Sequence, residues 1–205
     1  IMYFHGGGAG SRLLAKPLDP VATELNCRLI APDRPGIGLS DFQPGRMLLD
    51  WPADVCELAD MLKIQQFAVF SESGGTPYVA ACAYKIPERL TTAAIVAGTC
   101  PLDLPGVTQD MSKQNRTMVS LVQKAPFWLL RVMFGLQGNM AKKRPEKFLA
   151  QMMKGLPDVD RKALEKDGEF RDTMLNGLLE AFHQGSRGPA WDVKLVMQGW
   201  GFRLE

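Results

Sequence analysis

Short apolar segments alternate with segments of helical periodicity through the first hundred residues of the chain. Four of the apolar segments are rich in β-branched or aromatic residues and are closely followed by Gly, Pro, Asp or Ser, which is typical of strands. These predicted strands span residues 1–4, 28–31, 67–70 and 92–96. Between them, apolar positions recur at helical spacing over residues 13–25, 49–62 and 76–84. The alternation predicts an α/β fold, in which a parallel sheet is sandwiched by helices.

The pattern changes after residue 96. No convincing strand follows up to about residue 190, and amphipathic segments rich in Met and Lys take over, broken by Gly and Pro. They span residues 110–124, 126–136, 145–156 and 158–183. We therefore expect an α/β core over residues 1–100, an inserted α-helical cap over 101–190, and a return to the core over 191–205.

Both ends of the chain carry apolar, strand-like sequence. Ile1 opens an apolar run, and residues 200–205 are still alternately apolar where the sequence stops. We expect the chain to be cut at both ends, so that no signal peptide can be read from it.

Charge and composition exclude several classes of protein. The 205 residues include 24 Lys and Arg against 22 Asp and Glu, spread evenly, so we do not expect a nucleic-acid partner. The longest apolar stretch, residues 125–136, contains Arg131 and is shorter than the roughly 20 residues that span a bilayer. We therefore expect no membrane segment.

Cysteine and histidine usage argues against a metal site. The four cysteines are widely separated, without a CxxC pair, and the chain has only two histidines. This pattern indicates reduced thiols in the cytoplasm, and neither a metal nor a cofactor is expected.

A serine between a predicted strand and a predicted helix is the candidate nucleophile. Such a tight turn needs small residues two before and two after the nucleophile. Centring it on Ser73 places Ser71 and Gly75 there, whereas centring it on Ser71 would place Val69. Ser73 also lies at a helix start, where backbone amides favour developing negative charge.

A glycine-rich run after the first predicted strand, residues 5–11 (HGGGAGS), leaves backbone N–H groups accessible. Stabilising an oxyanion requires two such donors, one after the nucleophile and one from a neighbouring loop. Gly74 and Gly7 are the candidates.

Three motifs in order, HGGG at residues 5–8, DRPGIGLS at 33–40 and SESGG at 71–75, resemble the α/β-hydrolase superfamily, in particular its capped bacterial serine hydrolases. The resemblance implies that the predicted strands are the third to sixth of an eight-stranded sheet. It assigns Gly7 and Gly74 to the oxyanion hole and makes residues 33–40 a structural loop. Ser71 replaces the commoner first glycine of the elbow, and Gly8 stands where many members carry proline.

In that family the base is a histidine after the last strand, and the acid follows the sixth or seventh strand. The resemblance therefore places the histidine outside this chain. We interpret His5 as a structural residue of the glycine-rich loop and His183 as a partly exposed helix residue. Asp103 matches the position of the acid in some members, but a loop or helix-cap aspartate is the favoured interpretation.

The prediction is a serine hydrolase that acts by acyl transfer on an ester, amide or related carbonyl of a small molecule. A serine nucleophile disfavours the dehalogenase and epoxide-opening branches, which resemble this fold but use aspartate. We expect Glu72 to make local hydrogen bonds, and Asp33 and Arg34 to form a structural ion pair. A homodimer is left open.

Two alternatives stay open. A non-catalytic ligand-binding protein of this fold would explain the missing histidine directly. A dinucleotide-binding oxidoreductase would use Gly6, Gly8 and Gly10 with Asp33, but the motif needs a glycine where the chain has Ser11.

Overall fold

The computed structural model describes residues 1–7, 10–154 and 157–204. Three parallel strands form the sheet in this described part, in the order β1 (Met2–Phe4), β2 (Phe67–Glu72) and β3 (Leu90–Val96). Tyr3 lies opposite Phe70, which in turn lies opposite Ala94. β1 is buried throughout, whereas most of β3 is exposed.

The strand predicted at residues 28–31 is reduced to a single bridge. Ile30 pairs with Met2 on the side of β1 away from β2. Two hydrogen bonds hold it there, from Tyr3 N to Ile30 O at 2.8 Å and from Ile30 N to Ile1 O at 2.9 Å. Pro32 follows closely and has no N–H to donate, so the ladder does not continue.

Two helices pack on the sheet. α3 (Thr76–Lys85) contacts β2 and β3, and α2 (Trp51–Met61) packs against α3. Trp51, Val55 and Ala59 are spaced four residues apart and form the buried face of α2. The Trp51 ring meets Phe4 and Tyr78 edge-on, with centroids 5.3 and 5.8 Å apart, so this helix closes the core beside β1.

The segment predicted as the helix at residues 13–25 divides into a 3₁₀ helix, Arg12–Leu18, and α1 (Asp19–Glu24). Pro17 lies in the 3₁₀ helix and Pro20 in the first turn of α1, so both have lost an amide donor where the helix type changes.

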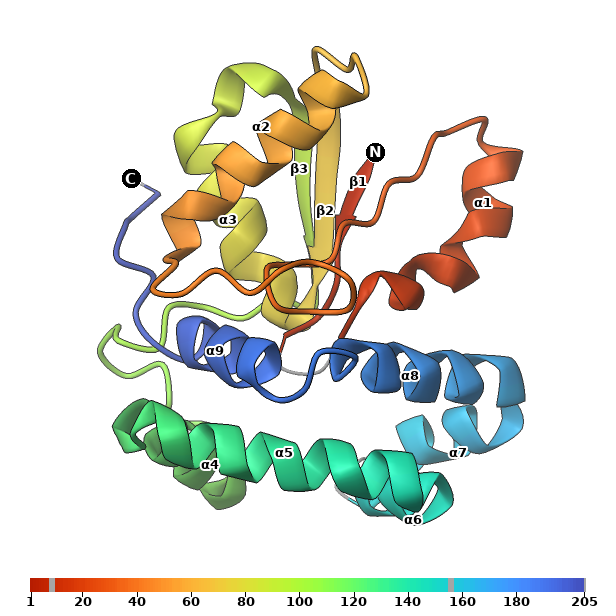
Figure 1. Ribbon diagram of the computed structural model, residues 1–205, viewed down its shortest axis with the longest axis vertical. Coiled ribbons are helices and arrows are strands. Elements are labelled where there is room, and N and C mark those ends of the chain that lie inside the picture. Colours follow the sequence, from red (N-terminus) through yellow and green to blue (C-terminus); the bar gives the residue numbers. More distant parts are fainter. Residues whose placement is uncertain (8–9, 155–156, 205) are drawn as a thin grey trace.

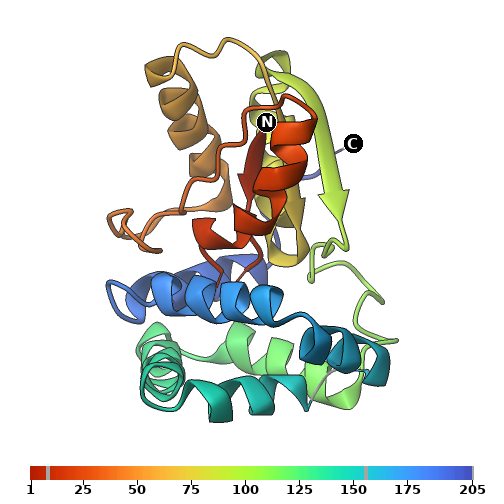
Figure 2. The same cartoon turned by 90° about the vertical axis from the view of Figure 1, so that its right-hand side faces the viewer.

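Within the part of the chain that the structure describes, six helices form a layer beyond the carboxyl ends of the strands, in the lower part of Figure 1. They are α4 (Lys113–Lys124), α5 (Phe127–Lys143), α6 (Pro145–Met153), α7 (Asp158–Lys166), α8 (Gly168–Ala181) and α9 (Arg187–Val196). α8 and α9 lie nearer the sheet than the other four, as Figures 1 and 2 both show. The division of the chain at residues 100 and 190 stays a prediction.

The segment predicted as one helix over residues 158–183 is two helices, α7 and α8. Asp167 separates them, and its side chain accepts a hydrogen bond from the amide of Phe170 at 2.9 Å. An aspartate that caps a new helix in this way favours a break over a continuous helix. Across the described chain, no helix is both long enough and apolar enough to cross a membrane.

Two apolar clusters hold the outer layer together. One joins α4 and α5 to α9, with Leu130, Ala190 and Val193 at its centre. The other joins α5, α6 and α8 through Ala141 and Phe148 with their neighbours. α9 also contributes Leu195 and Val196 to the core cluster that contains Phe4, Trp51 and Val69. This helix therefore belongs to both the outer layer and the core.

The start of α9 lies against the loop over residues 33–40. Gly36 has a φ of +83°, which glycine adopts without strain. A Cβ placed on Gly188 would lie 1.8 Å from the carbonyl oxygen of Gly36, so the two backbones touch directly.

Replacing Gly188 by alanine should therefore destabilise the fold. Because the added methyl group meets backbone and not a movable side chain, we expect Gly188→Ala to lower the free energy of unfolding by about 3 kcal/mol. Gly168, in the first turn of α8, has open space around its Cβ position and provides the matched control. Gly168→Ala should leave stability unchanged or raise it, because alanine is the better helix former. Denaturant titration measures the free energy of unfolding of both variants. Equal values for Gly188→Ala and Gly168→Ala would contradict the close contact between Gly188 and Gly36.

Candidate active site

Ser73 stands at a sharp turn between β2 and α3. Its φ is +46°, in the left-handed region that a side chain disfavours. Ser73 is exposed, whereas Ser71, Gly74 and Gly75 around it are buried. The Thr76 hydroxyl donates a hydrogen bond to the Ser73 carbonyl oxygen at 2.6 Å, which closes the turn. The serine side chain is therefore presented to solvent by a backbone that is held in a strained conformation.

Small residues flank the turn because the backbone of β1 lies against it. A Cβ on Gly75 would lie 2.4 Å from the carbonyl oxygen of Phe4 and 2.7 Å from the Cβ of Ser71. The residues two before and two after Ser73 therefore face each other, and no larger pair fits.

The glycine-rich loop meets the turn directly. A Cβ on Gly74 would lie 2.5 Å from the Gly7 nitrogen, and a Cβ on Gly7 would lie 3.2 Å from the Gly74 Cα. A Cβ on Gly6 would be 3.9 Å from the Cβ of Ser73, which places the loop beside the serine. The structure thus brings together Ser73, Gly7 and Gly74, while Gly8 lies outside the described residues. Two neighbouring backbone amides beside an exposed hydroxyl can stabilise a developing oxyanion.

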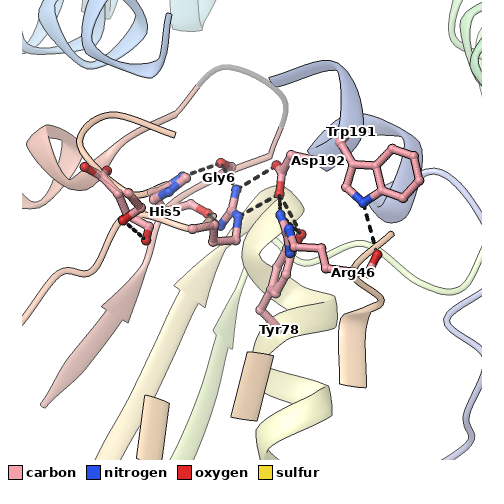
Figure 3. A network of polar contacts seen from close by, with 9 residues as sticks. His5, Gly6, Arg46, Tyr78, Trp191 and Asp192 are labelled. Carbon is pink, nitrogen blue, oxygen red and sulfur yellow. Dashed lines mark hydrogen bonds and ion pairs between the residues drawn. The ribbon is translucent and has the colours of Figure 1, made fainter. Parts of the chain in front are cut away.

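Behind the loop lies a buried cluster of charged side chains (Figure 3). Arg34 donates hydrogen bonds to the carbonyl oxygens of His5 at 2.7 Å and Gly6 at 2.9 Å. It also binds both carboxylate oxygens of Asp192, from Nε at 2.8 Å and from Nη2 at 2.9 Å. Arg34 and Asp192 have no exposed surface.

Further donors surround the carboxylate of Asp192. The Tyr78 hydroxyl donates to Oδ1 at 2.6 Å, and Arg46 donates to the same oxygen at 3.2 Å. Burial alone would raise the pKa of Asp192, but the charges of Arg34 and Arg46 and the hydrogen bonds outweigh burial, so this pKa lies well below its ordinary value. Asp192 is thus a buried carboxylate that stays ionised.

Asp33 and Arg34 do not pair with each other, contrary to the sequence-based interpretation. Asp33 accepts a hydrogen bond from the Arg12 backbone amide at 2.6 Å and forms an ion pair with the Arg12 guanidinium. Arg12 also pairs with Glu180 of α8 at 2.8 Å, while Arg34 pairs with Asp192. Both residues make structural ion pairs, each with a partner far away in the sequence.

The two histidines lie in different environments. His5 is buried, and its Nδ1 hydrogen-bonds the Gly6 carbonyl oxygen at 2.9 Å. Burial, followed by the charge of Arg34, lowers the pKa of His5 from 6.5 to about 3. His183 is exposed in the turn after α8. Within the described residues, no hydrogen bond joins Ser73 to either histidine.

The other candidate residues, Asp103 and Glu72, contact residues far away in the sequence. Asp103 is exposed in the loop after β3 and lies against Gly199, whose Cβ would be 2.4 Å from its carboxylate. It lines an open cavity of about 810 Å³ with Thr76 and Trp200, but Ser73 is not among the lining residues. Glu72 accepts a hydrogen bond from the Tyr3 hydroxyl at 2.7 Å, so its partner lies 69 residues away and is not the local one that was expected. Residues 1–7, 10–154 and 157–204 contain no group of three His, Cys, Asp or Glu that could hold a metal ion.

Sequence reasoning missed Asp192. It lies in α9 between Trp191 and Val193, in the segment over residues 191–205 that was expected to return to the core. A single acidic residue in an apolar segment was the available signal, but nothing local indicates its partner Arg34, which lies 158 residues away.

Comparison with known proteins identifies the fold. A family model described as the alpha/beta hydrolase fold matches residues 1–169. No curated protein matches the chain. Among solved structures, a thermophilic esterase from Thermogutta terrifontis is 18% identical with a TM-score of 0.61, and the match covers 96% of this chain and 62% of the esterase.

Two other solved structures are similar to the same extent. The enol-lactonase from Burkholderia xenovorans LB400 is 14% identical with a TM-score of 0.62, and the match covers 97% of this chain and 65% of the lactonase. The epoxide hydrolase CorEH is 16% identical with a TM-score of 0.65, and the match covers 95% and 65% of the two chains. The chain therefore spans less than two thirds of the length of these proteins.

The structural matches show the fold and leave the reaction open, because an esterase, a lactonase and an epoxide hydrolase share it. The α/β fold predicted from the sequence pattern and the family resemblance of the three motifs are both confirmed. With a family model that covers residues 1–169, the chain belongs to the α/β-hydrolase family.

Proposed function

We propose that this chain carries the nucleophile and the oxyanion hole of a serine hydrolase, which acts by acyl transfer on an ester, amide or related carbonyl of a small molecule. The observation that carries the proposal is the position of Ser73, exposed at a strained turn beside the paired backbones of Gly7 and Gly74. Strained residues with this exposure are typical of nucleophile elbows.

In the proposed reaction, the Ser73 hydroxyl oxygen attacks the substrate carbonyl, and its proton passes to a general base. The N–H groups of Gly7 and Gly74 stabilise the negative oxygen of the tetrahedral intermediate. Collapse of the intermediate expels the alcohol or amine, which takes up the proton and leaves an acyl-serine. Water then repeats the sequence, releases the acid and restores Ser73.

The general base is the part of this mechanism that the described residues do not supply. His5 is buried and makes its hydrogen bond to Gly6, and His183 is exposed without a hydrogen bond to Ser73. We propose that a histidine outside these two completes the site. Removing triad residues from serine hydrolases leaves about 10³ to 10⁴-fold acceleration over water, so we expect slow acylation of the chain by itself.

The alternatives fit less well. A ligand-binding protein without catalysis would need neither an exposed serine nor paired glycines, although the absence of a histidine beside Ser73 favours it. In a dinucleotide-binding protein, Asp33 would bind ribose, but Arg12 occupies both of its carboxylate oxygens. An epoxide hydrolase of this family would resemble the chain in fold but would carry aspartate in place of Ser73. A cytoplasmic location stays a prediction.

Covalent labelling tests the nucleophile. A fluorophosphonate probe, which forms a bond with an activated serine and releases fluoride, should slowly modify the wild-type chain on the peptide that contains Ser73, as measured by mass spectrometry. Ser73→Ala should remove this labelling and change the free energy of unfolding by less than about 1 kcal/mol, because only an exposed hydroxyl is lost. Ser71→Ala, which alters a buried serine two residues away, is the control and should keep the labelling.

Three outcomes of this experiment are informative. Equal labelling of wild type and Ser73→Ala would refute the assignment of the nucleophile. No labelling of the wild type even after prolonged exposure would favour the ligand-binding alternative. A large loss of labelling in His183→Gln would identify His183 as the base, whereas we expect no change.

The pH dependence of stability tests whether His5 is held neutral. Because its pKa is about 3 in the folded chain and 6.5 ordinarily, the unfolded chain binds more protons between these values. The free energy of unfolding should therefore fall as the pH decreases from 6.5, by up to about 1.4 kcal/mol per pH unit. His5→Asn should flatten this dependence between pH 5.5 and 6.5, above the range in which most carboxylates titrate. Ser11→Ala, at another buried position of the same loop, should change stability by the same amount at each pH. Identical slopes for wild type and His5→Asn would contradict a buried neutral imidazole.

A further inference from the structure

The buried pair of Arg34 and Asp192 has a direct connection to one of the two oxyanion donors. We propose that Arg34 and Asp192 are positioning residues that fix the direction of the Gly7 N–H, so that helix α9 sets the geometry of the oxyanion hole. The inference rests on the proposed function for its catalytic consequence, while its structural part stands independently.

The plane of the peptide between Gly6 and Gly7 sets the direction of the Gly7 N–H. In a trans peptide the C=O and the N–H point in opposite directions within one plane. Arg34 Nη2 binds the Gly6 oxygen at 2.9 Å, so the Gly7 N–H is turned away from the guanidinium. Arg34 Nη1 binds the His5 oxygen at 2.7 Å and fixes the preceding peptide as well. His5 Nδ1 also hydrogen-bonds the Gly6 oxygen at 2.9 Å, and together with the two Arg34 bonds it restrains a peptide that consecutive glycines would otherwise leave free to rotate.

Arg34 is itself held rigidly. Asp192 binds Nε and Nη2 through its two oxygens at 2.8 and 2.9 Å, a paired geometry that only a planar guanidinium offers. The Tyr78 ring lies beneath the guanidinium, 4.4 Å from its central carbon. Arg34 therefore has one orientation, and it transfers that orientation to the loop. A lysine could neutralise Asp192 but could not make these contacts together.

Helix α9 connects Asp192 to the contact between Gly7 and Gly74. Asp192 and Val196 are four residues apart and lie on the same face of this helix. Val196 methyl carbons lie 3.5 Å from the Cβ position of Gly7 and 3.4 Å from that of Gly74. One face of α9 thus contacts the loop in two ways. The Asp192 carboxylate holds Arg34, which binds the loop, and the Val196 methyl groups pack against Gly7 and Gly74. Figure 3 shows Asp192 reaching from α9 toward the loop.

Stability alone does not account for this arrangement. Two buried guanidinium groups, those of Arg34 and Arg46, share the carboxylate of Asp192, and burying such groups carries a desolvation cost that often cancels the attraction between them. A packed apolar cluster would support the fold as well, but it would not orient the carbonyl oxygens of His5 and Gly6. The pair therefore needs a test that separates orientation from stability.

The experiment compares Asp192→Asn and Arg34→Lys with the wild-type chain, using two measurements. The ¹⁵N relaxation of the Gly7 amide reports the mobility of the peptide without any substrate. We expect its order parameter to fall from about 0.85 toward 0.6 in both variants. The kinetics of Ser73 phosphonylation report the oxyanion hole. We expect the maximal rate of labelling to fall by about ten- to a hundredfold, somewhat less than the loss of a whole oxyanion donor, with the half-saturating probe concentration unchanged.

Two control variants separate this role from a loss of stability. Val55→Ala removes a buried side chain from α2 and should destabilise the fold without changing Gly7 mobility or the labelling rate. Tyr78→Phe removes one hydrogen bond to Asp192 but leaves every contact of Arg34 to the carboxylate and the carbonyl oxygens, so the labelling rate should change less than threefold. If Asp192→Asn does not fold, Arg34→Lys carries the test, because it keeps the positive charge beside Asp192.

The outcomes distinguish this inference from the proposed function. An unchanged Gly7 order parameter in both variants, with normal labelling, would overturn the inference and leave the nucleophile assignment intact. A mobile Gly7 in a chain whose Ser73 never reacts would support the positioning of the loop and refute the hydrolase. Val55→Ala losing as much labelling rate as Asp192→Asn would overturn the inference, because general destabilisation would then explain both.

Discussion

The carboxylate of Asp192 is the point on which the arrangement of this molecule depends. Arg34 and Arg46 reach it from the loop between Ile30 and Leu48, Tyr78 reaches it from α3, and Asp192 itself comes from α9. Such a centre joins elements that local hydrogen bonding cannot connect. It also removes water from the back of the glycine-rich loop, where a solvated carbonyl oxygen would be free to turn. The order of the sheet and helices brings these segments near each other, and the ion pairs determine how they meet.

Two guanidinium groups with one carboxylate are an uneven set of charges for a protein interior. The interaction is strong because the donors are directed at defined oxygens, but the desolvation of each ion opposes it. Removing one partner would be far more damaging than replacing the whole group, because the remaining charges would stay buried without compensation. The main consequence of this cluster is therefore a fixed geometry and not added stability. It fixes the orientation of the loop that carries Gly6 and Gly7, through the bonds from Arg34.

The local parts of the structure could be predicted from the sequence, and the long-range parts could not. The small residues around Ser73 predict a tight turn because steric contact acts over a few residues, and the structure has that turn. The periodicity of residues 49–62 likewise predicts α2. The strand predicted at 28–31 is only a single bridge, because Pro32 cannot donate to the ladder. A composition rich in β-formers does not show how many ladder bonds will form. The partners of Asp33 and Arg34 lie in other elements, and the spacing of a motif contains no information about them. The role of Asp103 as a catalytic acid stays a prediction, because the spacing of a motif does not show which residues it contacts.

The positive φ of Ser73 also has a cost in stability. A side chain in this region of backbone space costs about 1 to 2 kcal/mol, whereas glycine adopts it freely. Selection for folding alone would therefore favour glycine at this position, and each generation of random change would offer that gain. The serine therefore keeps the turn strained at the residue where the hydroxyl meets solvent. Backbone stability and the presence of a side chain at this turn thus make opposing demands on a single dihedral angle.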